Sequence, residues 1–192
     1  LRRNFRFLFA NRLESNDVAL SVALGNIDSI RMGFVSRTEA EEMEDYHYMV
    51  RQNLGNGIMD SAVKGGYIYY CLLNGLDLGP FSSLGRLMQF DFERTATVLN
   101  NLDSMAAKWN KRKFFNEVSL RVSYGVKKEL IGFCKLPDVG KVRAERLYAA
   151  GFRSSKDLVG KFDDVKKALN MKDEKIKINC PVITNELQKN RK

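Results

Sequence analysis

The longest amphipathic stretch of the chain runs from about Ser83 to Trp109. Side chains that suit a buried face recur there every three or four residues, which indicates a helix. These side chains are Leu84, Leu87, Met88, Phe92, Thr95, Val98, Leu99, Leu102 and Met105. The opposite face is polar and carries Arg86, Gln89, Arg94, Asn100 and Asn101. At 1.5 Å per residue such a helix measures about 40 Å, so the pattern predicts the central helix of a bundle.

Two shorter helices are predicted before this one. A capping box at Ser36–Glu39 opens a helix that continues to about Gln52. A second helix, over about 59–73, ends at Asn74-Gly75, which is a common C-cap signal. Its internal Gly65-Gly66 pair is costly in a helix. The pair favours either the close approach of another helix or a kink.

The segment near the N-terminus has two interpretations. Asn16 or Asp17 can cap a helix that extends to about Arg31, because the apolar positions between them suit a helix face. The alternation of apolar and polar residues over 18–24 also suits a strand. Both interpretations stay open at the level of sequence.

Short helices follow the long one. A basic helix is predicted from about Lys111 to Ser123, with Gly125 supplying the left-handed conformation that closes it. A shorter helix is predicted over 126–134, and Pro137 then enforces a turn. Because strand patterns are nearly absent, we expect an all-α protein.

The predicted helices fall into two groups with a boundary near 124–130. We place a helical bundle with a long central helix at 1–124, in which residues 1–15 could be a short remnant of a preceding domain. A small helix-hairpin-helix module is expected at 125–175. The remaining residues, 176–192, lose helical periodicity and are predicted to be a basic tail.

Charge is distributed unevenly along the 192 residues. The net charge is +9, with a balance of −3 over residues 1–104 and of +12 over residues 105–192. Such asymmetry indicates a polyanionic partner for the second half. A lysine-rich solubilising surface is the alternative explanation.

Other composition features narrow the class of protein. No run of about 18 apolar residues occurs, so no membrane span is predicted. Cys71, Cys134 and Cys180 are few, odd in number and far apart. This pattern favours a reducing cytoplasm over a disulfide framework or a zinc cluster. His47 has no second histidine at ligand spacing, so we expect a surface residue and no metal site.

The stretch "LPDVGKVRAERLYAAGF" (136–152) reads as a turn followed by a short basic helix. Gly140 permits close approach of a phosphate, and the helix after it presents unsatisfied backbone N–H groups. The residues expected to contact nucleic acid are Val139, Gly140, Lys141, Val142, Arg143, Arg146 and Arg153. Val139, Ala144, Leu147 and Tyr148 are expected to face inward. A purely structural hairpin is the alternative.

Asp138 stands at the tip of this hairpin. Its carboxylate repels phosphate. It is also a residue type that can cap the helix that follows and so rigidify the turn.

A longer stretch around the hairpin, "LRVSYGVKKELIGFCKLPDVGKVRAERLYAAGFRSSKDLV" (120–159), resembles one family. It is similar to the C-terminal end of archaeal Hjm/HELQ-type superfamily-two DNA repair helicases. The residues that carry the resemblance are Arg121, Val122, Tyr124, Gly125, Val126, Gly140, Arg143, Ala144, Leu147, Tyr148, Ala150 and Gly151. The turn itself resembles a helix-hairpin-helix motif, in which glycine is usual where this chain has Asp138.

The resemblance implies a role for each predicted domain. The long helix would belong to a domain that lies along the 3′ single strand and acts as a ratchet, and the hairpin domain would grip the emerging strand. The ratchet-helix candidates are Arg86, Gln89, Arg94 and Asn101. Val98 stands where the family has a tryptophan, and Trp109 is expected to pack against the end of the bundle.

The resemblance also implies what lies outside this sequence. The chain contains no G-x-x-x-x-G-K-[ST] motif, so no ATP hydrolysis by the family's mechanism and no cofactor are expected in it. ATP and Mg²⁺ would belong to motor domains upstream in the same polypeptide. The expected partner is single-stranded or forked DNA.

Two other functions fit parts of the sequence. The chain could be an RNA-helicase-type or protein-interaction module in which the hairpin is only scaffold. It could also be a DNA glycosylase, since helix-hairpin-helix modules occur in those enzymes. That activity needs a catalytic aspartate about 20 residues past the hairpin, where Asp157 is better interpreted as a capping residue in "SSKDLVG".

Overall fold

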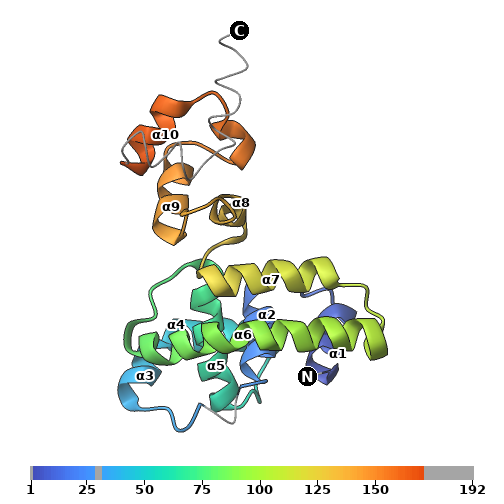
Figure 1. Ribbon diagram of the computed structural model, residues 1–192. Helices are drawn as coiled ribbons and strands as arrows, with labels where there is room; N and C mark the ends of the chain where they lie inside the picture. The colour runs from blue at the N-terminus through green and yellow to red at the C-terminus, as the bar shows by residue number, and fades with distance from the viewer. Residues whose placement is uncertain (1, 29–31, 171–192) are drawn as a thin grey trace. The chain divides into compact units, whose positions relative to one another are not determined.

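The computed structural model describes residues 2–28 and 32–170 and confirms the all-α prediction, because all regular elements in these ranges are helical (Figure 1). The chain divides into two compact units, Leu1–Gly125 and Val126–Lys192, which we call unit 1 and unit 2. The predicted tail at 176–192 lies outside the described residues.

Unit 1 contains seven α-helices among its described residues. They are α1 (Arg2–Ala10), α2 (Asp17–Gly25), α3 (Arg37–Glu42), α4 (Glu44–Leu54), α5 (Asp60–Asn74), α6 (Ser82–Leu102) and α7 (Arg112–Tyr124). A 3₁₀ turn at Gly79–Phe81 precedes α6, and a π-helical turn at Asp103–Ala107 follows it. The long helix α6 runs alongside α7 in unit 1 (Figure 1).

Several helix boundaries agree with the sequence signals. Asn16 caps α2 by accepting hydrogen bonds from the backbone of the next turn. The capping box of Ser36 and Glu39 is present, and Gly75 and Gly125 adopt the left-handed conformation after α5 and α7. The helical interpretation of the segment after Asn16 is therefore confirmed, although α2 ends at Gly25.

The predicted helix over 36–52 is wrong as a single element. It breaks at Met43, whose φ of −95° and ψ of 5° interrupt the helix between α3 and α4. The Met43 side chain is buried, and beyond the break α4 buries Tyr46 and Val50. Tertiary packing thus overrides a continuous local helix pattern.

The Gly65-Gly66 pair serves close packing. A side-chain carbon added to Gly25 at the end of α2 would lie 2.1 Å from the backbone nitrogen of Gly66. One added to Gly65 would lie 2.9 Å from the carbonyl oxygen of Gly25. Helix α5 continues through the pair, so close approach of α2 is confirmed and the kink is not.

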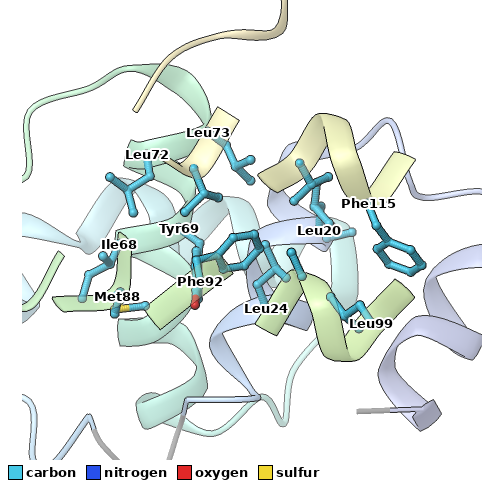
Figure 2. Close-up of a cluster of buried hydrophobic side chains, with 14 of the residues drawn as sticks. Leu20, Leu24, Ile68, Tyr69, Leu72, Leu73, Met88, Phe92, Leu99 and Phe115 are labelled. Atoms are coloured by element: carbon cyan, nitrogen blue, oxygen red, sulfur yellow. The ribbon is translucent and has the colours of Figure 1, made fainter. Parts of the chain in front are cut away.

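The main core of unit 1 forms where α2, α5, α6 and α7 meet (Figure 2). Leu20 and Leu24 come from α2, Tyr69 from α5, Phe92 from α6 and Phe115 from α7, and all five are nearly inaccessible to solvent. Because each helix contributes large side chains to the same cluster, the core holds α6 firmly along one face.

A partly buried ion pair connects three of these helices. The Arg121 guanidinium on α7 donates to both carboxylate oxygens of Asp17 at the start of α2, at 3.0 and 2.6 Å. It also donates to the carbonyl oxygen of Leu73 at the end of α5, at 2.9 Å. The charge of Arg121 is therefore paired and hydrogen-bonded, as a buried charge requires.

The long helix ends earlier than its pattern predicts. Helix α6 stops at Leu102, and Lys108 has a left-handed φ of 55° after the π-helical turn. The Asp103 carboxylate holds this corner by accepting hydrogen bonds from the backbone nitrogens of Asn110 and Lys111, at 2.9 and 2.7 Å. Trp109 packs against the rings of α1 and α7, as expected.

Unit 2 is a small helical module. Its elements are a 3₁₀ turn at Lys128–Leu130, α8 (Ile131–Cys134), α9 (Lys141–Ala149), a 3₁₀ turn at Ser155–Leu158 and α10 (Phe162–Leu169). Helix α9 contacts both α8 and α10. Its inward residues, Ala144 and Leu147, are fully buried, and so are Phe133 and Val165 on the neighbouring helices.

Candidate nucleic-acid interface

The hairpin of unit 2 consists of α8, a tight turn and α9. The turn is closed by a backbone hydrogen bond of 3.1 Å from Val139 to the carbonyl of Leu136. Asp138 has a φ of +57°. This left-handed conformation favours glycine, and aspartate is among the few other residues that adopt it readily. A glycine preference at this position therefore has a backbone cause.

Gly140 is the N-cap of α9, with a φ of −86° and a ψ of −172°. Any residue can adopt this extended conformation. A side-chain carbon added to Gly140 would meet no atom within 4 Å, apart from its chain neighbours, anywhere in the described structure. Neither the backbone conformation nor the packing of residues 2–28 and 32–170 therefore requires glycine here.

The start of α9 has no side-chain cap among the described residues. The suggestion that Asp138 caps this helix is thus wrong, because its left-handed backbone does not bring the carboxylate into capping position. Arg143 instead donates from its guanidinium to the carbonyl oxygen of Asp138. Its side chain folds back over the turn and stabilises the hairpin.

The predicted contact residues of the hairpin do not form one patch. Val139 is buried, so only its backbone is available to a ligand, whereas Val142 and Arg146 are exposed. Arg153 lies beyond the C-terminal end of α9. The nine residues of that helix span about 13 Å at 1.5 Å per residue.

Arg153 has local partners at that end. Its guanidinium donates to the carbonyl oxygens of Tyr148 and Phe152, at 2.8 and 3.0 Å, and lies 4.2 Å from the centre of the Tyr148 ring. Tyr148 was expected to face inward, but it is partly exposed, and its ring lies against this arginine. A cation–π contact of this kind cannot be predicted from the spacing of apolar residues in the sequence.

Asp157 has the capping role expected of it. Its carboxylate accepts hydrogen bonds from the backbone nitrogens of Arg153 and Ser154, both at 2.8 Å. These bonds favour the ionised form and lower the pKa of Asp157. A carboxylate held in this way belongs to the chain turn, which argues against the glycosylase interpretation.

A separate candidate surface is the solvent face of α6 in unit 1. Leu87, Val98 and Met105 were expected in the core, but they are exposed, whereas Met88, Phe92 and Leu99 of the same predicted stripe are buried. The predicted stripe combined two faces of the helix. Only one of these two faces of α6 is buried against α5 and α7.

Two of the four ratchet candidates share this solvent face. Arg94 and Asn101 are exposed and lie seven residues apart, which is two helical turns. Gln89 faces α7, where its amide donates to the carbonyl oxygen of Val122 at 2.9 Å. Arg86 is exposed on the flank of the face.

Sequence reasoning missed one prominent residue of this face. Phe90 on α6 is 84% exposed and lies one turn before Arg94. Phe90 and Arg94 belong to a series of residues spaced three or four apart. The other members of the series are Leu87, Val98, Asn101 and Met105. That second period was readable in the sequence and identifies a line of exposed residues, mostly apolar, along the outside of α6 and the π-helical turn after it.

The described residues show no metal site and no membrane span. Within 2–28 and 32–170, no group of three His, Cys, Asp or Glu side chains is placed to hold a metal ion. No helix in those ranges is long and apolar enough to cross a bilayer. Cys71 and Cys134 are buried and form no disulfide within the described ranges, and Cys180 lies outside the described residues.

Comparison with known proteins relates part of the chain to one group. The chain is 43% identical over 47 residues to the ATP-dependent DNA helicase Hel308 of Thermococcus kodakarensis, which covers 24% of this chain and 4% of that protein. The Hel308 of Aeropyrum pernix is 46% identical over 41 residues, or 21% of this chain and 6% of the relative. Part of this chain is thus related to archaeal DNA helicases.

A longer but weaker match points to the same group. The Hel308 of Methanocaldococcus jannaschii is 28% identical over 74 residues, which is 38% of this chain and 6% of that helicase. The matched segments span less than a tenth of these relatives. No family model matches the chain.

Proposed function

We propose that this chain is the non-motor C-terminal part of an ATP-dependent 3′–5′ DNA helicase of the Hjm/HELQ type, and that it holds single-stranded DNA during unwinding in repair. Unit 1 would be the ratchet domain and unit 2 the helix-hairpin-helix domain. ATP and Mg²⁺ would act in motor domains upstream in the same polypeptide. The similarity to Hel308 helicases supports this assignment.

The open space at Gly140 carries the argument for phosphate binding. Nothing within the described protein requires glycine there, so an external group is the simplest reason for leaving the position without a side chain. Helix α9 has no side-chain cap among the described residues, and the positive end of its helix dipole lies beside Gly140. A phosphate of the DNA backbone would fill the open space at Gly140 and would be stabilised by the positive end of this dipole.

Charge supports a polyanion at unit 2. Its described residues, 126–170, carry 11 Lys or Arg against 6 Asp or Glu, a net charge of +5. Of the basic side chains near the hairpin tip, Arg143 stabilises the turn, Lys141 is the first residue of α9, and Arg146 is exposed further along the helix. We assign the direct phosphate contacts to the backbone at 140–142, to Lys141 and to Arg146.

The solvent face of α6 supplies a different kind of contact. Phe90 and Arg94 are one turn apart, and both offer planar groups on which bases stack. Asn101 lies about 10 Å further along the helix at 1.5 Å per residue, where its amide can bond to a base or a phosphate. Such contacts depend little on salt, in contrast to the charged contacts of the hairpin.

A salt titration of a fluorescent single-stranded oligonucleotide tests the proposal. Replacing Lys141→Ala and Arg146→Glu together should weaken binding and reduce the slope of log K against log salt by roughly 0.7 for each lost phosphate contact. Replacing Phe90→Ala should weaken binding by about 1–3 kcal/mol with little change in slope.

Matched variants control for overall charge and for loss of an aromatic ring. Arg51→Ala with Arg37→Glu makes the same charge change on α3 and α4, and Tyr48→Ala removes another exposed ring there. These changes should leave binding almost unaltered. The DNA-binding proposal fails if the hairpin and α6 variants behave like their controls. Equal binding of an RNA oligonucleotide would favour the RNA-helicase-type alternative.

A further inference from the structure

Unit 1 also contains a hollow whose lining includes no residue of α6. It is formed by α1, α2, the first turn of α5 and the loop between α4 and α5, and its volume is about 350 Å³. Its floor includes Leu8, Ala19, Val22 and Ala62, all buried aliphatic side chains. This volume falls within the usual range of binding pockets, about 300–1,000 Å³.

Two large apolar side chains stand at the edge of this hollow without being buried. Phe7 on α1 is 56% exposed, and Met59 just before α5 is 60% exposed. Helix α1 is already anchored to the core by Phe5 and Leu8, so Phe7 is not needed for that packing. Exposed apolar groups around an apolar hollow are typical of an interaction site.

The rim beside Phe7 is positively charged. Helix α1 carries Arg2, Arg3 and Arg6, all exposed, and contains no acidic residue. Arg3 itself lines the hollow, together with Asn4. The same surface therefore offers an aliphatic floor for an apolar side chain and guanidinium groups for carboxylates.

We propose that this hollow docks an acidic amphipathic segment of a partner protein. An apolar side chain of the segment enters between Phe7 and Met59, and its aspartates or glutamates pair with Arg3 and Arg6. The floor of the hollow favours a protein ligand over a nucleic acid, because it is formed by aliphatic side chains that suit an apolar protein side chain, and Phe7 at the edge is the one ring among the described residues that line it. Apolar anchors flanked by charge are common in helix-in-groove recognition.

The test uses fluorescence anisotropy with three labelled 14-residue peptides and the whole 192-residue chain. The first has Leu and Phe at positions i and i+4, with Asp and Glu on the other faces. The second has the same composition in scrambled order, and the third has Lys in place of Asp and Glu. Only the first should bind well, because it alone combines an apolar face with complementary charge.

Substitutions at the exposed positions Phe7 and Arg3 test the docking site and should leave the fold intact. Phe7→Ala and Arg3→Glu should each weaken binding of the first peptide by roughly fivefold or more, as expected for central interface residues. Tyr48→Ala and Arg37→Glu are the matched changes on α3 and α4 and should leave that binding unaltered. The methyl resonances of Ile58 and Met59 should shift on peptide addition, and circular dichroism verifies that each variant keeps its helix content.

Three outcomes would overturn the proposal. One is equal binding of the ordered and scrambled peptides, and another is binding that ignores Phe7→Ala and Arg3→Glu. The third is loss of oligonucleotide binding in these variants with no effect on the peptide, which would make the hollow a nucleic-acid surface. The result is independent of the hairpin and α6 variants, so DNA binding and peptide docking can each fail alone.

Discussion

The two units place glycine where it serves opposite purposes. In unit 1, Gly25 and Gly66 let the backbones of α2 and α5 come into direct contact, and an added side-chain carbon at Gly25 would lie 2.1 Å from the neighbouring backbone. In unit 2, the space around Gly140 is open throughout the described structure. The first kind of glycine is required by the fold, whereas nothing in the described part of the fold requires the second.

Gly25→Ala should have the largest effect, and the effect should be on stability. The added carbon collides with backbone of α5, which cannot move without separating two helices of the core. Overpacking of this kind costs typically 1–3 kcal/mol and sometimes more, and we expect the upper end of that range. Urea unfolding of the wild-type chain and the variant measures the difference.

Gly132→Ala is the matched control for this experiment. Gly132 lies in helix α8, where an added carbon would meet no atom within 4 Å in the described part of the chain. An alanine there should be neutral or slightly stabilising, because alanine is the better helix former. Similar losses in both variants would contradict the close-packing explanation.

The sequence predicted this contrast only in part. The Gly65-Gly66 pair indicated close approach or a kink, but nothing in the pattern identified Gly25, 40 residues away in the chain, as its partner. Local capping signals at Asn16, Ser36 and Gly125 were reliable because they act within one turn of helix. Contacts between residues far apart in the chain depend on how the helices pack, and the partners in such contacts cannot be identified from local sequence patterns.

The candidate site was also predictable in part. Arg94 and Asn101 were identified on the polar face of α6, but Phe90 beside them was overlooked. Helix α6 has apolar residues on two faces, and spacing alone does not say which face will be buried. At the hairpin, residue types suggested that Arg143 binds a ligand, whereas its bond to the Asp138 carbonyl depends on a backbone conformation that the sequence does not show.

Gly140→Ser should separate stability from binding at the hairpin. Serine is at least as good an N-cap residue as glycine, so the free energy of unfolding should stay the same or rise by a few tenths of a kcal/mol. Its side chain occupies the open space and caps the N–H groups that we assign to phosphate. Loss of one hydrogen bond to a charged group, about 1.5–3 kcal/mol, predicts at least roughly tenfold weaker oligonucleotide binding.

The same two measurements can refute this interpretation of Gly140. Urea unfolding reports on the cap, and anisotropy with the fluorescent oligonucleotide reports on binding. A stable Gly140→Ser variant that binds as tightly as the wild-type chain would show that the open space is not used by DNA. The hairpin would then be only structural, and the α6 face would have to account for binding.

Asp138→Gly should have the smallest effect and act in the opposite direction. Glycine relieves the left-handed strain at a φ of +57°, which we expect to add about 0.5 kcal/mol of stability. It also removes a negative charge from the hairpin tip, so oligonucleotide binding should strengthen a few-fold at low salt and less at high salt.

Asp138→Asn separates the two causes, because asparagine also tolerates the left-handed conformation but is neutral. Equal gains in binding for both variants would assign the effect to charge. A gain for glycine alone would assign it to the backbone, and no gain for either would mean that phosphate does not approach the tip.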